Sequence, residues 1–210
     1  MPVVVVEGIT CVGKTRTVRA IVRDSWFSDH ATHLLVGEQI TTVPIGAIEN
    51  DGSINQPARR GHHSELMNIV DGLHRIANTS KAEGYNLPCI VLERFYLSLA
   101  VKSGAAQSIP PDLAEVDDWL CSMDALLVLL VIDPELIPSR LADAKLRRQG
   151  VERDAMERCF SSPGTACRLA LKQANYQYLI SKMRVRSLVV NTRDCAWEKY
   201  ARLIVAQFDR

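Results

Sequence analysis

One stretch near the start of the chain, Gly8 to Thr15, constrains the fold more than any other. It reads Gly-Ile-Thr-Cys-Val-Gly-Lys-Thr and fits the pattern G-x-x-x-x-G-K-[ST] without a mismatch. A run of four valines precedes it, as is typical of a strand buried on both faces, and helical spacing follows from Lys14. Strand, glycine-rich loop and helix come in the order of a phosphate-binding loop. A glycine-rich turn that binds nothing is the alternative.

This pattern predicts a particular chemistry. Gly8 and Gly13 can adopt backbone angles that other residues avoid, so successive N–H groups can converge on phosphate oxygens at the helix N-terminus. Lys14 is then expected to reach the outer phosphates of a nucleotide, and the Thr15 hydroxyl is expected to bind Mg²⁺.

Length and charge favour a single domain without a general affinity for nucleic acid or membrane. The chain has 210 residues, which suits one well-buried domain, and its net charge of +1 offers no general attraction to nucleic acid or anionic membrane. The valine run is too short for a signal peptide or a membrane span, so we expect a soluble cytoplasmic protein. The six cysteines are scattered without a C-x-x-C pair, which predicts free thiols.

Strands and helices are expected to alternate along the chain. Apolar runs predict strands near residues 2–6, 33–36, 87–92, 124–132 and 184–190. Helical spacing predicts helices near 14–25, 62–81, 96–105, 110–121, 134–150, 163–183 and 196–208. The helix near 110–121 is expected to expose an acidic face through Glu115, Asp117 and Asp118, and residues 37–61 to form a long connection. This alternation implies a parallel sheet with ligands at the carboxyl ends of the strands.

Polar residues that end strands are the next candidates. Glu93 and Arg94 follow the third strand, where a carboxylate can hold Mg²⁺ through water and an arginine can clamp a phosphoryl group; a surface ion pair or helix cap is the alternative. Glu38 ends the second strand and is interpreted either as a general base or anchor for an acceptor hydroxyl or as a solvated carboxylate. Asp133 also ends a strand, but Asp-Pro-Glu is a good N-cap sequence, so we expect a cap there rather than a metal ligand.

An arginine-rich segment at about residues 140–158 is a predicted lid. Arg140 and Arg147 are seven residues apart and share a helix face, with Arg148 beside them and Arg153 further along. Planar guanidinium groups that close over a transferring phosphoryl group can supply much of the catalysis. A solvated helix face with Glu152 and Asp154 as local partners is the alternative.

Two motifs are typical of one group of kinases. In Val6 to Thr15 a Glu-Gly pair leads into the loop, and Leu92-Glu93-Arg94-Phe95-Tyr96-Leu97-Ser98 is similar to the Asp-Arg-Tyr and Glu-Arg-Ser motifs of thymidylate and deoxynucleoside kinases. Over most of its length the chain resembles this group. The resemblance implies a three-layer α/β/α P-loop NTPase fold in a single domain (residues 1–210). Its five-stranded parallel sheet is expected to have the order 2-3-1-4-5 and to carry a helical lid. ATP and Mg²⁺ are expected to bind at the top of the sheet, where the carboxyl ends of the strands lie.

The resemblance also implies roles for individual residues. Glu93 is given the Mg²⁺ side of the site and Arg94 the phosphate clamp, while Val190-Asn191-Thr192 stands where these families have an adenine-contacting loop. The residues predicted to bind the cofactor are Gly8, Cys11, Val12, Gly13, Lys14, Thr15, Arg16 and Arg140, and those predicted to act in catalysis are Lys14, Arg94, Glu38, Arg147 and Arg148. Thr15 and Glu93 are the predicted metal ligands.

We therefore expect an Mg-ATP-dependent kinase that phosphorylates a nucleoside, a nucleoside monophosphate or a similar small molecule, with homodimerisation left open. Residues 37–42 differ from the runs that both families have after the second strand, so the sequence leaves the acceptor open. One rival is a nucleotide-hydrolysing switch without a small-molecule acceptor. Another is a fold that only binds nucleotide within a partner complex.

Overall fold

Five parallel strands form the centre of the protein in the computed structural model, which describes residues 1–30, 33–37, 56–83, 88–97, 101, 111–147 and 160–208. The strands are β1 (Val3–Gly8), β2 (His33–Val36), β3 (Cys89–Glu93), β4 (Leu126–Val131) and β5 (Arg186–Asn191). Their order in the sheet is β2-β3-β1-β4-β5, and every pair of neighbours is parallel. The predicted strand order is confirmed.

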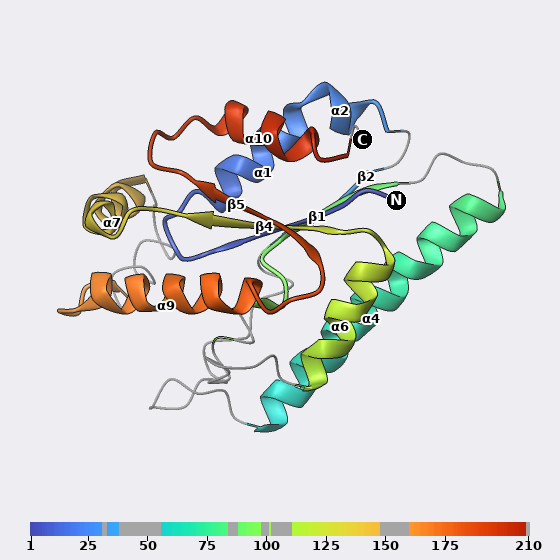
Figure 1. Ribbon diagram of the computed structural model, residues 1–210, viewed down its shortest axis with the longest axis horizontal. Helices are drawn as coiled ribbons and strands as arrows, with labels where there is room; N and C mark the ends of the chain where they lie inside the picture. Colours follow the sequence, from blue (N-terminus) through green and yellow to red (C-terminus); the bar gives the residue numbers. More distant parts are fainter. Residues whose placement is uncertain are drawn as a thin grey trace.

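Helices cover both faces of this sheet. They are α1 (Lys14–Arg23), α2 (Ser25–Ser28), α4 (Gln56–Ala82), α6 (Pro111–Ser122), the 3₁₀ turn η2 (Pro134–Leu136), α7 (Ile137–Arg147), α9 (Thr165–Ile180) and α10 (Trp197–Val205). Figure 1 shows α1, α2 and α10 on one face and α4, α6 and α9 on the other, with α7 at one end of the sheet. The predicted three-layer arrangement is therefore confirmed. No helix in the described ranges combines the length and the apolarity needed to cross a membrane.

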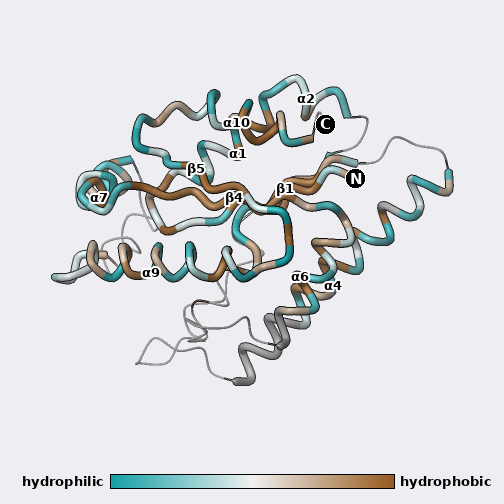
Figure 2. Tube along the Cα trace, viewed as in Figure 1, coloured by the Kyte–Doolittle hydropathy of each residue, from teal (hydrophilic) through white to brown (hydrophobic). Residues whose placement is uncertain are grey.

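The three central strands are the core of the molecule. Every residue of β1, β3 and β4 is buried, as the unbroken apolar runs predict for strands covered on both faces. Figure 2 shows the most hydrophobic positions concentrated along these strands, with hydrophilic positions on the outer sides of the helices. The edge strands differ: β5 alternates between partly exposed and more buried positions, and Leu35 on β2 is 47% exposed.

Parallel pairing brings the ends of distant segments to one edge of the sheet. Val6 on β1 lies beside Glu93 on β3, and Gly8 lies beside Leu130 on β4. The glycine-rich loop after β1, the polar pair after β3 and the ends of β4 and β5 therefore share this edge. That edge is where ligands gather in open parallel sheets.

Two local predictions are wrong. The connection expected over 37–61 contains the start of α4 at Gln56, because Pro57 is a helix-start residue here rather than a turn signal. The predicted capping by the Asp133 side chain is the second: Asp133 is the N-cap residue of the 3₁₀ turn η2, but its side chain makes no capping hydrogen bond. Its carboxylate accepts a hydrogen bond from Asn191 Nδ2 at 2.8 Å and pairs with Arg193 at 3.2 Å, and the segment after it is a 3₁₀ turn.

Some predicted features lie outside the described residues. They include Glu38, Arg148 and Arg153, most of the helix expected over 96–105, and the lid beyond Arg147.

The expected acidic face of α6 is wrong at Asp117, which is 2% exposed. Its carboxylate accepts hydrogen bonds from Tyr96 Oη at 3.1 Å and from the backbone N–H of Arg184 at 3.0 Å and of Val185 at 3.4 Å. Burial, and then the negative charge of Asp117, raises the pKa of Tyr96 well above its usual range, so Tyr96 stays neutral and donates. Asp117 thus joins α6 to the segment after β3 and to the turn before β5.

We predict that Asp117→Ala lowers the free energy of unfolding by about 3 kcal/mol, because it leaves one hydroxyl and two N–H groups buried without their acceptor. Asp118→Ala is the matched control. Its carboxylate is 57% exposed and pairs only at the surface, with Arg184, so the loss should stay below about 0.5 kcal/mol. Urea unfolding of both variants measures the difference; equal losses would contradict the role given to Asp117.

Candidate phosphate-binding site

The loop between β1 and α1 has a backbone that only glycine accommodates at two positions. Gly8 has φ +146° and Gly13 has φ +101°, and Gly13 is the N-cap of α1. A Cβ atom at Gly8 would lie 2.6 Å from the carbonyl oxygen of Leu130 on β4. Cys11 also has a positive φ, +70°. The loop therefore wraps tightly over the end of the sheet and leads into the N-terminus of a helix, which is a favourable place for an anion.

The side chain of Lys14 contacts the backbone of this loop. Its side chain is buried, and Nζ donates hydrogen bonds to the carbonyl oxygens of Gly8 at 3.1 Å and of Ile9 at 3.0 Å. These neutral carbonyls are weaker acceptors for an ammonium than the charged oxygens of a phosphate. The arrangement holds a cation at the position where the sequence pattern predicts phosphate contact.

Thr15 and Glu93 meet although 78 positions separate them in the chain. Thr15 Oγ1 donates a hydrogen bond to Glu93 Oε1 at 2.5 Å, and Glu93 is 7% exposed. The pairing of β1 with β3 brings them together, since Glu93 ends β3 and Thr15 is in the first turn of α1. The two residues predicted as metal ligands are thus adjacent.

Arg94 is held in an unusual backbone conformation next to this pair. It has φ +57°, a region that few non-glycine residues adopt, and only 8% of it is exposed. Its N–H donates to the Val6 carbonyl oxygen at 2.8 Å. Strain of this kind persists only where surrounding contacts fix it.

Glu7 supplies such contacts. It is fully buried, and its Oε1 accepts hydrogen bonds from the N–H groups of Phe95 at 2.9 Å and Leu97 at 3.1 Å. The residue immediately before the phosphate loop therefore holds the turn that carries Glu93 and Arg94. Sequence reasoning noticed the Glu-Gly pair but gave Glu7 no such function.

The loop between β5 and α10 closes the other side of the site. The Trp197 ring lies against Gly13, where an added Cβ would be 2.3 Å from ring atoms. The guanidinium carbons of Arg16 and Arg140 each lie 5.8 Å from the centroid of this ring. Arg140 Nη2 also donates to the carbonyl oxygens of Thr192 at 2.6 Å and Arg193 at 3.2 Å. Two of the predicted cofactor-binding residues are thus assembled around an indole that the sequence did not single out.

The structure does not bring every predicted residue to the site. Arg147 is exposed at the end of α7 and pairs with Asp143 at 3.4 Å. This pairing is the solvated-face alternative for the described part of the lid. Glu38 and Arg148 lie outside the described residues, so their roles stay predictions.

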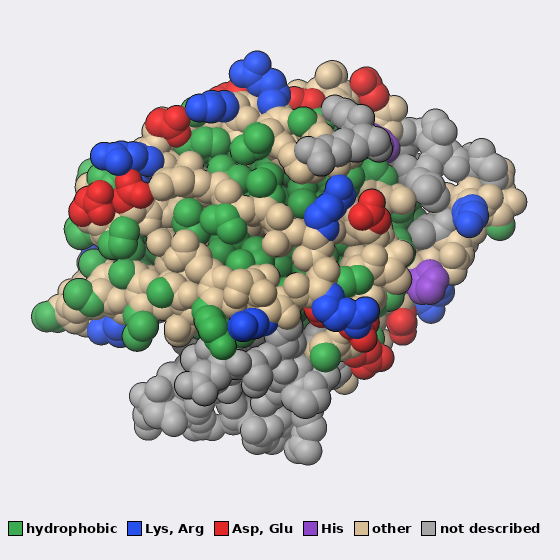
Figure 3. All heavy atoms as spheres, viewed as in Figure 1, with side chains coloured by type: hydrophobic (Ala, Val, Ile, Leu, Met, Phe, Trp, Pro, Cys, Tyr) green, Lys and Arg blue, Asp and Glu red, His purple; other side chains and the backbone are tan. Residues whose placement is uncertain are grey.

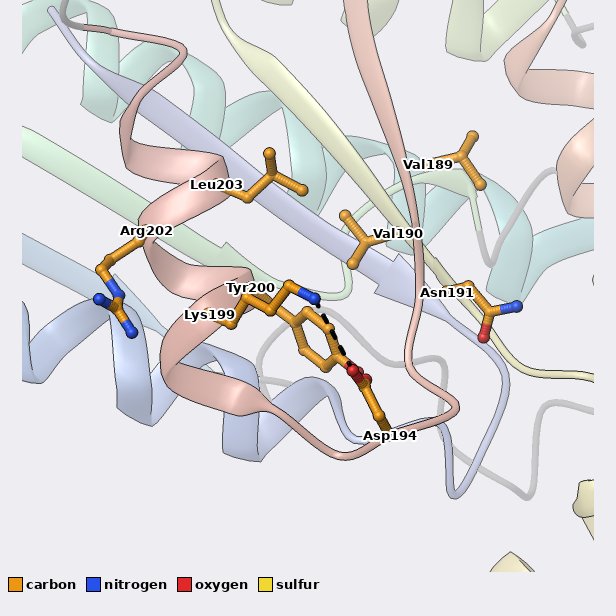
Figure 4. Close-up of a pocket in the computed structure, with 8 residues that line it drawn as sticks. All are labelled: Val189, Val190, Asn191, Asp194, Lys199, Tyr200, Arg202 and Leu203. Atoms are coloured by element: carbon orange, nitrogen blue, oxygen red, sulfur yellow. Dashed lines mark hydrogen bonds and ion pairs between the residues drawn. The ribbon is translucent and has the colours of Figure 1, made fainter.

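A cavity of about 650 Å³ lies beside β5 and α10, and Val190 and Asn191 of the stretch predicted to contact adenine are among its lining residues. Val189 and Leu203 on its apolar side are 48% and 46% exposed. Hydrophobic side chains gather across the middle of the molecular face drawn in Figure 3. Figure 4 shows Lys199 and Tyr200 directed toward Asp194, whereas Arg202 points away from it. None of the residues predicted for the phosphate site lines this cavity.

Comparisons with known proteins agree with this geometry at the level of the fold. No family model and no curated protein sequence matches the chain. The solved structures with a similar fold include the following three, each at 14% sequence identity over 99% of this chain. YorR from Bacillus subtilis, in complex with phosphorylated GDP, has a TM-score of 0.58 over 95% of its length. Thymidylate kinase from Candida albicans has a TM-score of 0.55 over 90%, and shikimate kinase from Acinetobacter baumannii, in complex with shikimate, 0.51 over 92%.

The sheet order, the flanking helices and these similarities define the class: the chain has the fold of the P-loop kinases. At 14% identity this likeness concerns the fold.

We predict that Gly13→Ala lowers the free energy of unfolding by about 2 kcal/mol or more, because the new Cβ meets the Trp197 ring and the backbone must hold a positive φ. Gly72→Ala is the control. Gly72 lies inside α4 with open space around its Cα, so alanine should raise stability by about 0.5–1 kcal/mol. Chemical denaturation measures both; a Gly13→Ala variant as stable as the parent would contradict the described loop.

Proposed function

We propose that the chain is an Mg²⁺-dependent phosphotransferase that moves the terminal phosphoryl group of ATP to a small-molecule acceptor. The observation that carries the proposal is the Thr15–Glu93 hydrogen bond, which sets a hydroxyl and a carboxylate side by side at the start of α1, next to Lys14. The likeness to two proteins named as kinases, and to a third bound to phosphorylated GDP, supports it.

Thr15 and Glu93 fit a magnesium ion. A hydroxyl and a carboxylate are hard oxygen donors, and Mg²⁺ in phosphoryl-transfer sites takes one or two protein ligands and completes its shell with phosphate and water. When bound, the ion would neutralise negative charge on the outer phosphates as the phosphoryl group moves.

Lys14 and Arg94 are the cations that we assign to the phosphates. Lys14 has three N–H donors and at present makes hydrogen bonds to two loop carbonyls. Because a charged phosphate oxygen is the stronger acceptor, we expect at least one of these donors to turn to the nucleotide. Arg94 starts from a backbone that Glu7 and Val6 help to fix, which suits a guanidinium that must clamp a transferring group in one position.

We assign the base end of the nucleotide to Arg140, Arg16 and Trp197. A guanidinium plane and an indole ring both stack well on a flat aromatic base. Arg147 and Arg148 remain the proposed lid cations.

The acceptor is the part of the proposal that rests on sequence alone. In the transfer the acceptor oxygen bonds to the terminal phosphorus, the bond to the bridging oxygen breaks, and ADP leaves with that electron pair. A hydroxyl acceptor also loses a proton, for which we propose Glu38 as the base. A nucleoside monophosphate offers an oxygen that is already deprotonated and needs no base.

Acceptor-dependent release of ADP tests the function. The protein is incubated with Mg-ATP and a panel of nucleosides, nucleoside monophosphates and small alcohols, against an ATP-only blank. We expect one acceptor class to raise the rate at least about 100-fold over the blank. If that acceptor reacts through a hydroxyl, Glu38→Gln should lower kcat about 100-fold. A rate that no acceptor changes would instead support a nucleotide-hydrolysing switch.

Lys14→Ala tests the phosphate loop itself. We predict a fall in kcat/KM for ATP of at least about 100-fold, the usual cost of removing one charged donor from a developing negative charge. Lys182→Ala is the control, since Lys182 is an exposed lysine whose ammonium lies over the Tyr178 ring and touches nothing in the site. Unchanged turnover of a folded Lys14→Ala variant would refute the assignment.

A further inference from the structure

Thr192 contacts the phosphate loop, the end of β4 and α7, and it has no assigned role beyond its place in the stretch expected to contact adenine. It follows β5 directly and is fully buried. Its hydroxyl oxygen lies 2.9 Å from the carbonyl oxygen of Val12 in the phosphate loop and 3.1 Å from that of Val131 at the end of β4. Its own N–H donates to the same Val131 oxygen at 2.8 Å. The Val131 carbonyl oxygen already accepts this backbone hydrogen bond. We therefore infer that the Thr192 hydroxyl donates its single proton to the carbonyl oxygen of Val12.

The carbonyl oxygen of Thr192 is also an acceptor. It accepts hydrogen bonds from Arg140 Nη2 at 2.6 Å and from the N–H of Cys195 at 3.2 Å. One residue therefore contacts the phosphate loop through its side chain and α7 through its backbone. The same β5–α10 loop leads into α10, whose first residue, Trp197, has its ring against Gly13.

Holding the Val12 carbonyl has a direct effect on the next N–H group. Val12 C=O and Gly13 N–H belong to one planar trans peptide unit, so the two groups point in opposite directions. A hydroxyl that fixes the carbonyl on the Thr192 side therefore aims the Gly13 N–H toward the opposite side. In a phosphate-binding loop such N–H groups are the anion donors. Glycine at this position, with its wide range of backbone angles, gains most from such a restraint.

We propose that Thr192 is a positioning residue for nucleotide binding: its hydroxyl orients the Val12–Gly13 peptide, while its carbonyl holds Arg140 of α7. This inference rests on the proposed function, because it concerns how the same loop binds the phosphates of a nucleotide. This role needs no contact between the fully buried Thr192 side chain and the nucleotide. Thr192 acts through the direction of one peptide and the position of one guanidinium.

Three variants test the inference. Thr192→Val keeps the shape of the side chain and removes the donor, and Thr192→Ser keeps the donor and removes a methyl group. Thr165→Val is the matched control: Thr165 is also buried, and its hydroxyl donates to Ser162 O at 2.8 Å at the start of α9, away from the phosphate loop. Calorimetric titration with Mg-ADP and Mg-ATP gives Kd, and urea unfolding gives the stability of each variant.

We expect Thr192→Val to raise Kd for both nucleotides about tenfold, the effect of one misdirected donor. Thr192→Ser should stay within about twofold of the parent, and Thr165→Val should bind like the parent even where it loses stability. In steady-state assays with an active acceptor, KM for ATP should rise in Thr192→Val while KM for the acceptor stays the same.

The outcomes separate this inference from the proposed function. If the parent protein binds Mg-ATP and Thr192→Val is less stable yet binds equally well, Thr192 is only structural and the inference is wrong. If Thr192→Ser binds tenfold more weakly, the methyl group matters and the hydroxyl argument fails; this comparison holds even if Thr192→Val does not fold. A parent protein that binds neither nucleotide would overturn the proposed function and this inference with it.

Discussion

The hydrogen bond between Thr15 and Glu93 is the contact on which the rest of the site depends. It exists because β1 and β3 pair in parallel with Val6 beside Glu93, which sets the first turn of α1 next to the end of β3. The same pairing brings the Glu7 carboxylate to the turn after β3, where it accepts hydrogen bonds from two backbone N–H groups. A shift in the register of these two strands would move both carboxylates and separate the hydroxyl from its partner.

Buried side chains of both charges lie at the site. Two carboxylates, Glu7 and Glu93, lie at the sheet edge where the proposed phosphates would add more negative charge. The Glu7 carboxylate accepts hydrogen bonds from two backbone N–H groups. Two buried cations lie near in the chain: Lys14 belongs to the phosphate loop, and Arg94 directly follows Glu93. Uncharged contacts with the phosphate loop come from Thr192, which follows β5, and from Trp197 at the start of α10.

Local patterns predicted much of this fold. The loop motif, the buried strands and the helix that follows Gly13 could be read from neighbouring residues, and family resemblance supplied the strand order. Asp117, Asp133 and Thr192 could not be placed in this way, because their partners come from segments about 60 to 180 positions away. Asp133 is the clearest case: its sequence suits a helix cap, but Asn191 and Arg193 reach its carboxylate first. A polar residue directly after a buried strand was the available signal for Thr192, as it was for Glu93.

A crystal structure of the protein with Mn²⁺ and a non-hydrolysable ATP analogue would show whether Thr15 and Glu93 hold the metal ion beside the outer phosphates. Mn²⁺ replaces Mg²⁺ at oxygen sites and is located by its anomalous scattering. The account predicts one manganese peak bonded to Thr15 Oγ1, on the side of the Glu93 carboxylate, with the outer phosphates against Lys14. A manganese ion and triphosphate bound elsewhere, or a Lys14 that stays on the Gly8 and Ile9 carbonyls with the analogue present, would contradict it.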